Sequence, residues 1–329
     1  MNKNKYLYIL YLGIIFAACT KIVPGFLSDT LGYTQKEIIC TRGLAYDASE
    51  KINFDGSTPP VKFELINLRD SLTGQSAPKE FDSTYDVTQF KPGQTFDAQT
   101  DTTIALLNAK RESVKLKPYF FNQVSGQFVF NHGSAHLPTG MYCFDIKATN
   151  VHGVKIYPSA GYIHVLDPTD DDLYEVVYTA CSASNDATGT FTTMKNIKFS
   201  ITKISSDNAI TIVKIVDKNG VPFNPKNGEV ITRGDRPYFG TYAKFHPITY
   251  TDTAMICNFE VAPFPLANYV DNAGTDWGFL QYYRIPSKYI AIDNMPSTNG
   301  FSANPVFSFQ LKLEGTYEIV VQMTDATHK

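Results

Sequence analysis

The amino-acid sequence predicts an all-β protein with two β-sandwich domains. Phenylalanine and tyrosine are abundant, with 23 and 20 copies among 329 residues, and 21 glycines and 18 prolines supply turns. Aromatic and β-branched residues favour strands, whereas glycine and proline favour the tight turns between them. Apolar residues with helical spacing are confined to residues 102–111, where Ile104 and Leu107 are expected to share one face of a short helix.

Residues 1–18 have the layout of an export signal. Two lysines precede an apolar run at 6–16, and two alanines stand directly before Cys19. The run is too short for a membrane-spanning helix, which needs about 20 apolar residues. Small residues before a cysteine at this place are typical of a lipoprotein signal. We therefore expect cleavage before Cys19 and acylation of that cysteine, so that the mature chain hangs from a membrane by lipid. An ordinary secretory signal with a coincidental cysteine is the alternative.

The first part of the mature chain is predicted to be a tether at 19–32, followed by a domain at 33–167. Strands are expected where aromatic, β-branched or alternating apolar residues gather, namely at 36–41, 61–68, 128–131, 141–149 and 161–166. Residues 69–103 are polar and rich in turn formers. This composition predicts a long excursion from the core.

A proline and three consecutive aspartates at 168–172 predict a linker, because neither packs well inside a sheet. Residues 173–329 then make up the second predicted domain. Its strands are expected at 174–179, 197–204, 209–216, 254–261, 306–313 and 317–323. Alternation of apolar and polar residues is plain in Phe307, Phe309 and Leu311.

One pattern occurs in both predicted domains. Gly140, Tyr142 and the alternating apolar residues that follow match Gly315, Tyr317 and their successors in the same order. A turn glycine, a core tyrosine and inward aliphatic residues at every second place suit the penultimate strand of a sandwich. The pattern predicts two related domains, with chance similarity of two strands as the alternative.

Four cysteines follow the predicted lipidation site, two in each predicted domain. Disulfides form in the cell envelope, so Cys40 with Cys143 and Cys181 with Cys257 are the pairs to test. The alternating apolar residues around Cys257 favour a buried thiol instead of the second bridge. The sequence leaves the state of all four cysteines open.

Residues 121–153 contain Phe121-Asn122, then Leu137-Pro138 and the Gly140 strand, and this stretch resembles the central signature of cadherin-like, immunoglobulin-type domains. The resemblance implies a β-sandwich. Cadherins bind calcium with acidic residues at the domain junction, and the acid of their Ala-Thr-Asp pattern is replaced here by an asparagine. The junction still carries candidate calcium ligands, and a solvated linker is the alternative: Asp167, Asp170 and Asp172.

A second resemblance covers the whole chain and is carried best by residues 87–97 and 102–111. In these stretches the chain is similar to outer-membrane lipoproteins of Bacteroidota, of unassigned function, that accompany SusC/SusD-type glycan uptake systems. The resemblance implies a binding or accessory role at the cell outer membrane. SusC/SusD-type proteins and glycans are the partners it implies. Whether the chain faces the cell surface or the periplasm stays open.

The single tryptophan marks the most specific candidate site. It lies among short polar residues and tyrosines. Sugar faces settle on flat aromatic rings, and carboxylates and guanidinium groups bind pairs of hydroxyls. The candidate carbohydrate-binding residues are therefore three rings and two polar partners: Trp277, Tyr282 and Tyr283, with Asp276 and Arg284. A tryptophan that fills the core beside its loop is the alternative.

Other motifs point to no further site. Arg233-Gly234-Asp235 contains the integrin tripeptide, but three residues are better explained by a turn with a local ion pair. A formal net charge of −3 without a basic stripe argues against nucleic acid as a partner.

The chain also lacks the sequence motifs of common enzyme sites, namely the serine elbow, the zinc-protease helix and the phosphate loop. We therefore expect a non-catalytic cell-envelope lipoprotein that binds glycan or assists a SusC/SusD-type system. A structural or adhesive interaction module is the first alternative. An envelope hydrolase is the second, since the carboxylate pair of a glycosidase has no sequence signature.

Overall fold

The computed structural model shows an all-β protein, with 46% of residues in strands and 8% in helices. The residues that the structure describes are 26–44, 48–97, 100–151, 153–206, 208–243, 245–258, 270–296 and 300–329. The predicted signal peptide and Cys19 lie outside them. Within the described residues, no helix combines the length and the apolar character that a membrane crossing requires.

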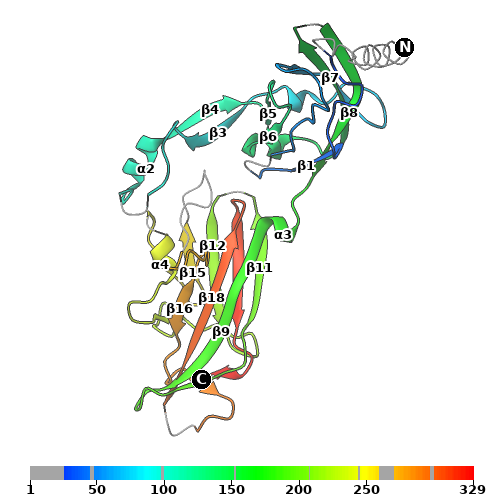
Figure 1. Ribbon diagram of the computed structural model, residues 1–329. Helices are drawn as coiled ribbons and strands as arrows, with labels where there is room; N and C mark the ends of the chain where they lie inside the picture. The colour runs from blue at the N-terminus through cyan, green and yellow to red at the C-terminus, as the bar shows by residue number, and fades with distance from the viewer. Residues whose placement is uncertain are drawn as a thin grey trace, which may run out of the picture. The chain divides into compact units, whose positions relative to one another are not determined.

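The chain divides into two compact units (Figure 1). Unit 1 comprises the described residues up to Ser83 together with Lys117–Leu166, and unit 2 comprises Thr84–Leu116 and Asp167–Lys329. The division after Leu166 coincides with the stretch of proline and aspartates. Residues 84–116 group with unit 2, which differs from a contiguous domain at 33–167.

Unit 1 is built on a four-stranded sheet in the order β1-β8-β7-β2. These strands are β1 Glu37–Thr41, β2 Lys62–Asp70, β7 Gly140–Asn150 and β8 Gly153–Leu166. A hairpin of β5 Tyr119–Phe121 and β6 Phe128–Phe130 packs against the sheet, and the rings of Phe128 and Phe144 lie 5.1 Å apart. Short 3-10 helices occur at Lys79–Phe81 and His132–His136.

The strands predicted for the first domain are all present, but β8 begins at Gly153, well before the predicted start at 161. Val154 and Ile156 in its first half are 60% and 55% exposed. Apolar side chains therefore point to solvent where alternation would place polar ones. The pattern that marks a half-buried strand is missing from this half.

The predicted excursion contains regular structure. β3 Tyr85–Phe90 pairs antiparallel with β4 Arg111–Leu116, and α2 Ile104–Lys110 directly precedes β4. The predicted helix at 102–111 is thus confirmed. Its Leu107 is fully buried, whereas Ile104 is 38% exposed, so the two do not share a buried face.

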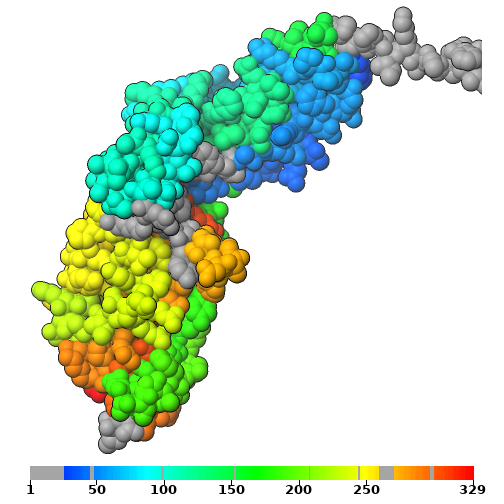
Figure 2. All heavy atoms as spheres, turned by 60° about the vertical axis from the view of Figure 1, so that its left-hand side comes forward, coloured from blue at the N-terminus to red at the C-terminus, as the bar shows by residue number. Residues whose placement is uncertain are grey.

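Residues 84–116 make contact with the rest of unit 2 through aromatic rings. Phe96 lies edge-on to Phe245, with 6.4 Å between ring centroids. In Figure 2 the cyan atoms of this segment lie next to the yellow atoms of the residues around Phe245. Residues 84–116 thus belong to unit 2, although in the sequence they lie between the two parts of unit 1.

Unit 2 contains two five-stranded sheets, which we call sheet A and sheet B. Sheet A has the order β10-β9-β18-β16-β13 and sheet B the order β11-β19-β12-β15-β14. Sheet A consists of β9 Tyr174–Asn185, β10 Phe191–Thr193, β13 Ile231–Thr232, β16 Gln281–Arg284 and β18 Phe301–Leu311. Sheet B consists of β11 Lys198–Ser205, β12 Ile210–Val216, β14 Thr249–Tyr250, β15 Met255–Asn258 and β19 Thr316–Gln322.

The two sheets pack face to face around phenylalanine rings. Phe199 of β11 lies 5.6 Å from Phe307 and 6.0 Å from Phe309 of β18, measured between ring centroids. The remaining elements of unit 2 are α3 Asp170–Leu173, α4 Phe239–Tyr242 and the pair formed by β17 Ile290–Ile292 and β20 Ala326–His328.

The repeated glycine-tyrosine pattern has the same local structure in both units. The hydroxyl of Tyr142 donates a hydrogen bond to the carbonyl of Pro138 at 3.1 Å, and that of Tyr317 donates to the carbonyl of Leu313 at 2.7 Å. Both acceptors lie four residues upstream. Each tyrosine belongs to an interior strand of its sheet, β7 and β19. The two tyrosines therefore share a local conformation as well as a sequence pattern.

The four described cysteines are buried thiols, so neither candidate pair forms a disulfide, and the buried thiol favoured for Cys257 is found. Cys40 and Cys143 lie on β1 and β7, which are separated by β8. Two strand spacings amount to about 10 Å, whereas a disulfide joins Cα atoms at most about 7 Å apart. Cys181 and Cys257 lie in opposite sheets, and burial raises the pKa of Cys257 to about 12.

Candidate functional site

The predicted sugar-stacking residues are divided between two environments. Tyr283 is only 2% exposed, and its ring lies 6.0 Å from that of Phe307 between the sheets. Its hydroxyl accepts a hydrogen bond from the Phe239 N–H at 3.1 Å and lies 3.3 Å from Gln281 Oε1. Tyr283 is thus a core residue, and this corrects its assignment as a stacking residue. The reason is the strand geometry of β16, which sends adjacent tyrosines to opposite faces.

Tyr282 and Arg284 project from the other face of β16. Tyr282 is opposite Val306 in β18, and Val306 is opposite Ala180 in β9, so these residues share one face. We call this face, which is turned away from sheet B, the outer face of sheet A. It carries a set of aromatic, polar and charged side chains: Tyr178, Ser184, Phe191, Tyr282, Arg284, Ser302, Asn304 and Ser308.

Trp277 lies at one end of the outer face. Its ring is perpendicular to that of Tyr178, with 5.7 Å between centroids and an interplanar angle of 88°. Tyr178 is 42% exposed, and Trp277 is half-buried. The pair therefore presents aromatic surface to solvent at a fixed angle. Trp277 neither fills the core completely nor stands free of it.

The loop before Trp277 fixes the orientation of the indole ring. Indole Nε1 donates a hydrogen bond of 2.9 Å to the carboxylate of Asp271. This bond, with further bonds from backbone N–H groups, lowers the pKa of Asp271. Asp276 Oδ1 accepts a bond of 2.8 Å from the Gly278 N–H. The predicted polar partner Asp276 thus shapes the turn that carries the tryptophan.

Arg233 and Arg236 lie in a turn that projects from the edge of sheet A. β13 pairs with β16. Past the end of β13, the carbonyl of Pro237 accepts a hydrogen bond of 2.8 Å from the N–H of Tyr282 in β16. Residues 233–236 form a turn between these two pairings, in which the Arg236 N–H donates to the Arg233 carbonyl at 3.2 Å. The predicted turn around Gly234 is confirmed. Among the described contacts it contains no ion pair, so the expected local pairing of its charges is wrong.

The two arginines of this turn stack on aromatic rings of the outer face. Arg236 lies 5.2 Å from the ring centroid of Tyr282, and Arg233 lies 5.0 Å from that of Phe191. Phe191 belongs to β10 and the turn follows β13, and these are the two edges of the sheet. In a flat five-stranded sheet the edges are about 19 Å apart. The contact therefore shows that the turn and the edge strand close over the outer face.

Polar groups are buried beneath this closure. Ser184, Ser302 and Asn304 are each at most 2% exposed, although they face away from the interior between the sheets. Arg284 donates to Ser184 Oγ, and its guanidinium also lies 4.0 Å from the carboxylate of Asp186. Asn304 Oδ1 and Arg284 Nε are buried and have no hydrogen-bond partner among the described residues. Unpaired buried polar atoms are costly and mark places where a further group fits.

The candidate calcium ligands serve a different purpose. Asp172 Oδ2 accepts hydrogen bonds from the backbone N–H and the hydroxyl of Thr169, each at 2.8 Å. These bonds cap the short helix α3, whose first residue is Asp170. In the described part of the chain, no three acidic, histidine or cysteine side chains gather as metal ligands would. The candidate calcium ligands Asp167, Asp170 and Asp172 form no such group, and Asp172 caps a helix instead.

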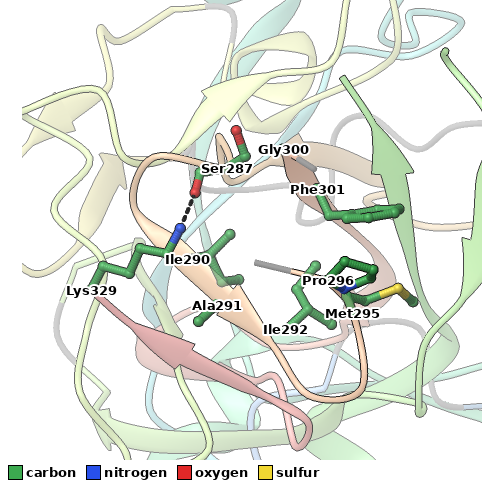
Figure 3. Close-up of a pocket in the computed structure, with 9 residues that line it drawn as sticks. All are labelled: Ser287, Ile290, Ala291, Ile292, Met295, Pro296, Gly300, Phe301 and Lys329. Atoms are coloured by element: carbon green, nitrogen blue, oxygen red, sulfur yellow. Dashed lines mark hydrogen bonds between the residues drawn. The ribbon is translucent and has the colours of Figure 1, made fainter. Parts of the chain in front are cut away.

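A separate cavity lies near the C-terminal strand β20 (Figure 3). Ile290, Ile292 and Phe301 contribute to its walls, and Lys329 closes one side by donating to the Ser287 carbonyl at 2.7 Å. Its volume of about 60 Å³ is far below the roughly 300–1,000 Å³ of typical ligand pockets. The cavity is too small for a sugar ring.

Sequence reasoning missed Tyr178, Phe191 and Asn304, because only the sheet register brings them together with Tyr282. The two arginines beside Gly234 carried a usable signal, namely two cations close to an aromatic residue in a turn. Comparison of the chain with protein-family models, with curated proteins and with solved structures gave no match.

Proposed function

We propose that this protein is a non-catalytic, lipid-anchored protein of the cell envelope whose second domain binds glycans on the outer face of sheet A. One observation carries the proposal: Tyr282 and Arg284 share the outer face of sheet A, and Trp277 packs against Tyr178 of the same face, with the rings partly exposed. Half-exposed rings next to polar side chains suit sugars, which present C–H groups on their faces and hydroxyls at their edges.

The length of the outer face favours an oligosaccharide over a single sugar. Tyr178, beside Trp277, and Ser184, beside Phe191, lie on the same strand, and at about 3.4 Å per residue they are about 20 Å apart. Aromatic rings thus stand at both ends of the strip and at Tyr282 between them. Rings fixed on strands lose little freedom on binding, which favours affinity.

Both domains are proposed to be immunoglobulin-like sandwiches. The support is the pair of tyrosines whose hydroxyls bind a carbonyl four residues upstream, because this tyrosine corner is typical of such domains. Stacking of sheets A and B around Phe199 fits the same architecture. In sandwiches of this kind the face of a sheet or the loops at its ends bind ligands, and here the face carries the aromatic residues.

Anchoring through Cys19 in the outer membrane and association with SusC/SusD-type proteins belong to the same proposal. A sheet face that binds glycan would serve such a system by holding polysaccharide near the transporter. Incorporation of labelled palmitate into the full chain, compared with Cys19→Ser, tests the anchor. We expect label only in the parent protein, and equal labelling of both proteins would contradict lipidation at this residue.

The glycan proposal is tested with the mature chain and a panel of neutral and acidic polysaccharides by affinity electrophoresis. Trp277→Ala should weaken binding of the retained polysaccharides about 5- to 30-fold, since an aromatic contact contributes about 1–2 kcal/mol. Phe120→Ala is the control, because Phe120 is 61% exposed but belongs to unit 1. Retention of no polysaccharide, or equal retention of the parent and Trp277→Ala proteins, would refute the proposed site.

A further inference from the structure

Positive charge is concentrated at one end of the outer face. Arg233, Arg236 and Arg284 lie close together. The carboxylate of Asp186 is 4.0 Å from Arg284, and Asp235 belongs to the turn itself. Burial lowers the pKa of Arg233, and the charges of Arg236 and Arg284 lower it further, as expected for neighbouring cations. Within the described residues, neither Arg233 nor Arg236 forms an ion pair. Among the described residues, only one of these three guanidinium groups, that of Arg284, forms an ion pair.

Two of these guanidinium groups are held in place by aromatic rings and not by acids. Stacking on Phe191 and Tyr282 restrains Arg233 and Arg236 and leaves their N–H groups without a carboxylate. An arginine that is already restrained loses little entropy when it binds a planar anion through two parallel hydrogen bonds. The turn is therefore organised to receive an anion from outside the chain.

Two buried polar atoms beside this turn have no hydrogen-bond partner among the described residues. Asn304 Oδ1 is an acceptor without a donor, and Arg284 Nε is a donor without an acceptor. Both atoms are covered by the protein, so the groups open to an anion are the N–H groups of Arg233 and Arg236.

We propose that the outer face of sheet A selects acidic glycans, and that the turn 233–236 together with Arg284 binds the carboxylate of a uronic acid residue. This inference rests on the proposed function and narrows its substrate class. The aromatic rings of Trp277 and Tyr178 supply stacking that any sugar can use. The arginines add the discrimination between acidic and neutral chains.

The test compares oligogalacturonate with its fully methyl-esterified form, in which the sugars are the same and the charges are removed. Isothermal titration of the mature chain should give at least tenfold tighter binding of the acid, with affinity that falls as salt rises. Arg236→Gln and Arg233→Gln should each reduce affinity for the acid about tenfold and leave affinity for the ester unchanged. Lys288→Gln is the matched control, because Lys288 also lies over a ring, 4.4 Å from that of Tyr289, but outside the outer face.

Each outcome separates the two proposals. Equal affinity for acid and ester would overturn the acidic preference and leave glycan binding intact. Absence of binding for acid, ester and every neutral glycan would overturn both. Tighter binding of a sulfated oligosaccharide than of the uronate would overturn the assignment to a carboxylate. Urea midpoints from Trp277 fluorescence show whether the arginine variants are folded, and Arg236 is exposed, so its replacement should not move the midpoint.

Discussion

Replacement of Tyr317 by phenylalanine removes one hydroxyl from the centre of sheet B. The side chain is fully buried, and its hydroxyl donates a 2.7 Å hydrogen bond to the carbonyl of Leu313, which is itself only 8% exposed. Phenylalanine keeps the ring in place and leaves this carbonyl without its donor. Loss of a buried hydrogen bond with one partner left unpaired costs about 1–3 kcal/mol. We expect the free energy of unfolding of unit 2 to fall by about 2 kcal/mol.

Urea unfolding followed by tryptophan fluorescence measures this loss in unit 2 alone, because Trp277 is the only tryptophan of the chain. With a urea dependence of about 2.5 kcal/mol per M, the midpoint should fall by about 0.8 M. Tyr142→Phe is the matched control, since it removes the equivalent hydroxyl from unit 1. Its effect should appear in circular dichroism and not in the Trp277 transition.

The reasoning fails if Tyr317→Phe leaves the midpoint unchanged, because the corner hydrogen bond would then contribute nothing to unit 2. It also fails if Tyr142→Phe shifts the Trp277 transition as far as Tyr317→Phe does. The effect of the hydroxyl would in that case not be local to its own unit.

Three further substitutions test other contacts of unit 2. Gly315→Ala should destabilise unit 2 by more than about 1 kcal/mol in urea unfolding. The reason is that φ is +157° and the new Cβ would lie 2.8 Å from the carbonyl oxygen of the last residue of β11. An unchanged urea midpoint would show that the turn adapts. Burial raises the pKa of Glu229, but hydrogen bonds from a backbone N–H and from His328, at 2.6 Å, outweigh it and lower the pKa overall. Its carboxylate therefore stabilises the fold above about pH 4.3, and that contribution is lost as the pH falls through the lowered pKa. Glu229→Gln should accordingly flatten the fall of urea midpoint between about pH 5 and 3, and an identical pH profile would argue against this role. Asp271→Ala should leave the indole of Trp277 without its acceptor and increase acrylamide quenching, which equal quenching would contradict.

Much of the fold could be predicted because most strands carry a clear apolar pattern. β12 occupies 210–216 and was expected at 209–216, and β19 occupies 316–322 and was expected at 317–323. β16 could not be recognised, because its first residue, Gln281, is polar yet fully buried. β18 was expected from 306 but begins at Phe301, since its first half buries Ser302 and Asn304 where a strand is usually apolar.

The candidate site could be predicted in part. Trp277 and Tyr282 were identified by composition, because aromatic residues among short polar ones are unusual wherever they occur. The choice between Tyr282 and Tyr283 required the strand register, since neighbouring residues on a strand face opposite sides. The stacking of Arg233 on Phe191 depends on closure of two sheet edges, and nothing in either local sequence encodes that closure.

The assignment of residues 84–116 to unit 2 has a practical consequence for anyone who dissects the protein. A fragment that starts at Asp167 would lack β3, α2 and β4, and Phe245 would lose the neighbouring ring of Phe96. Deletion of residues 84–116 from a fragment of unit 1 would remove a segment that groups with unit 2 and not with unit 1. The natural building block for expression and labelling therefore contains both units together, since no single cut yields both units complete.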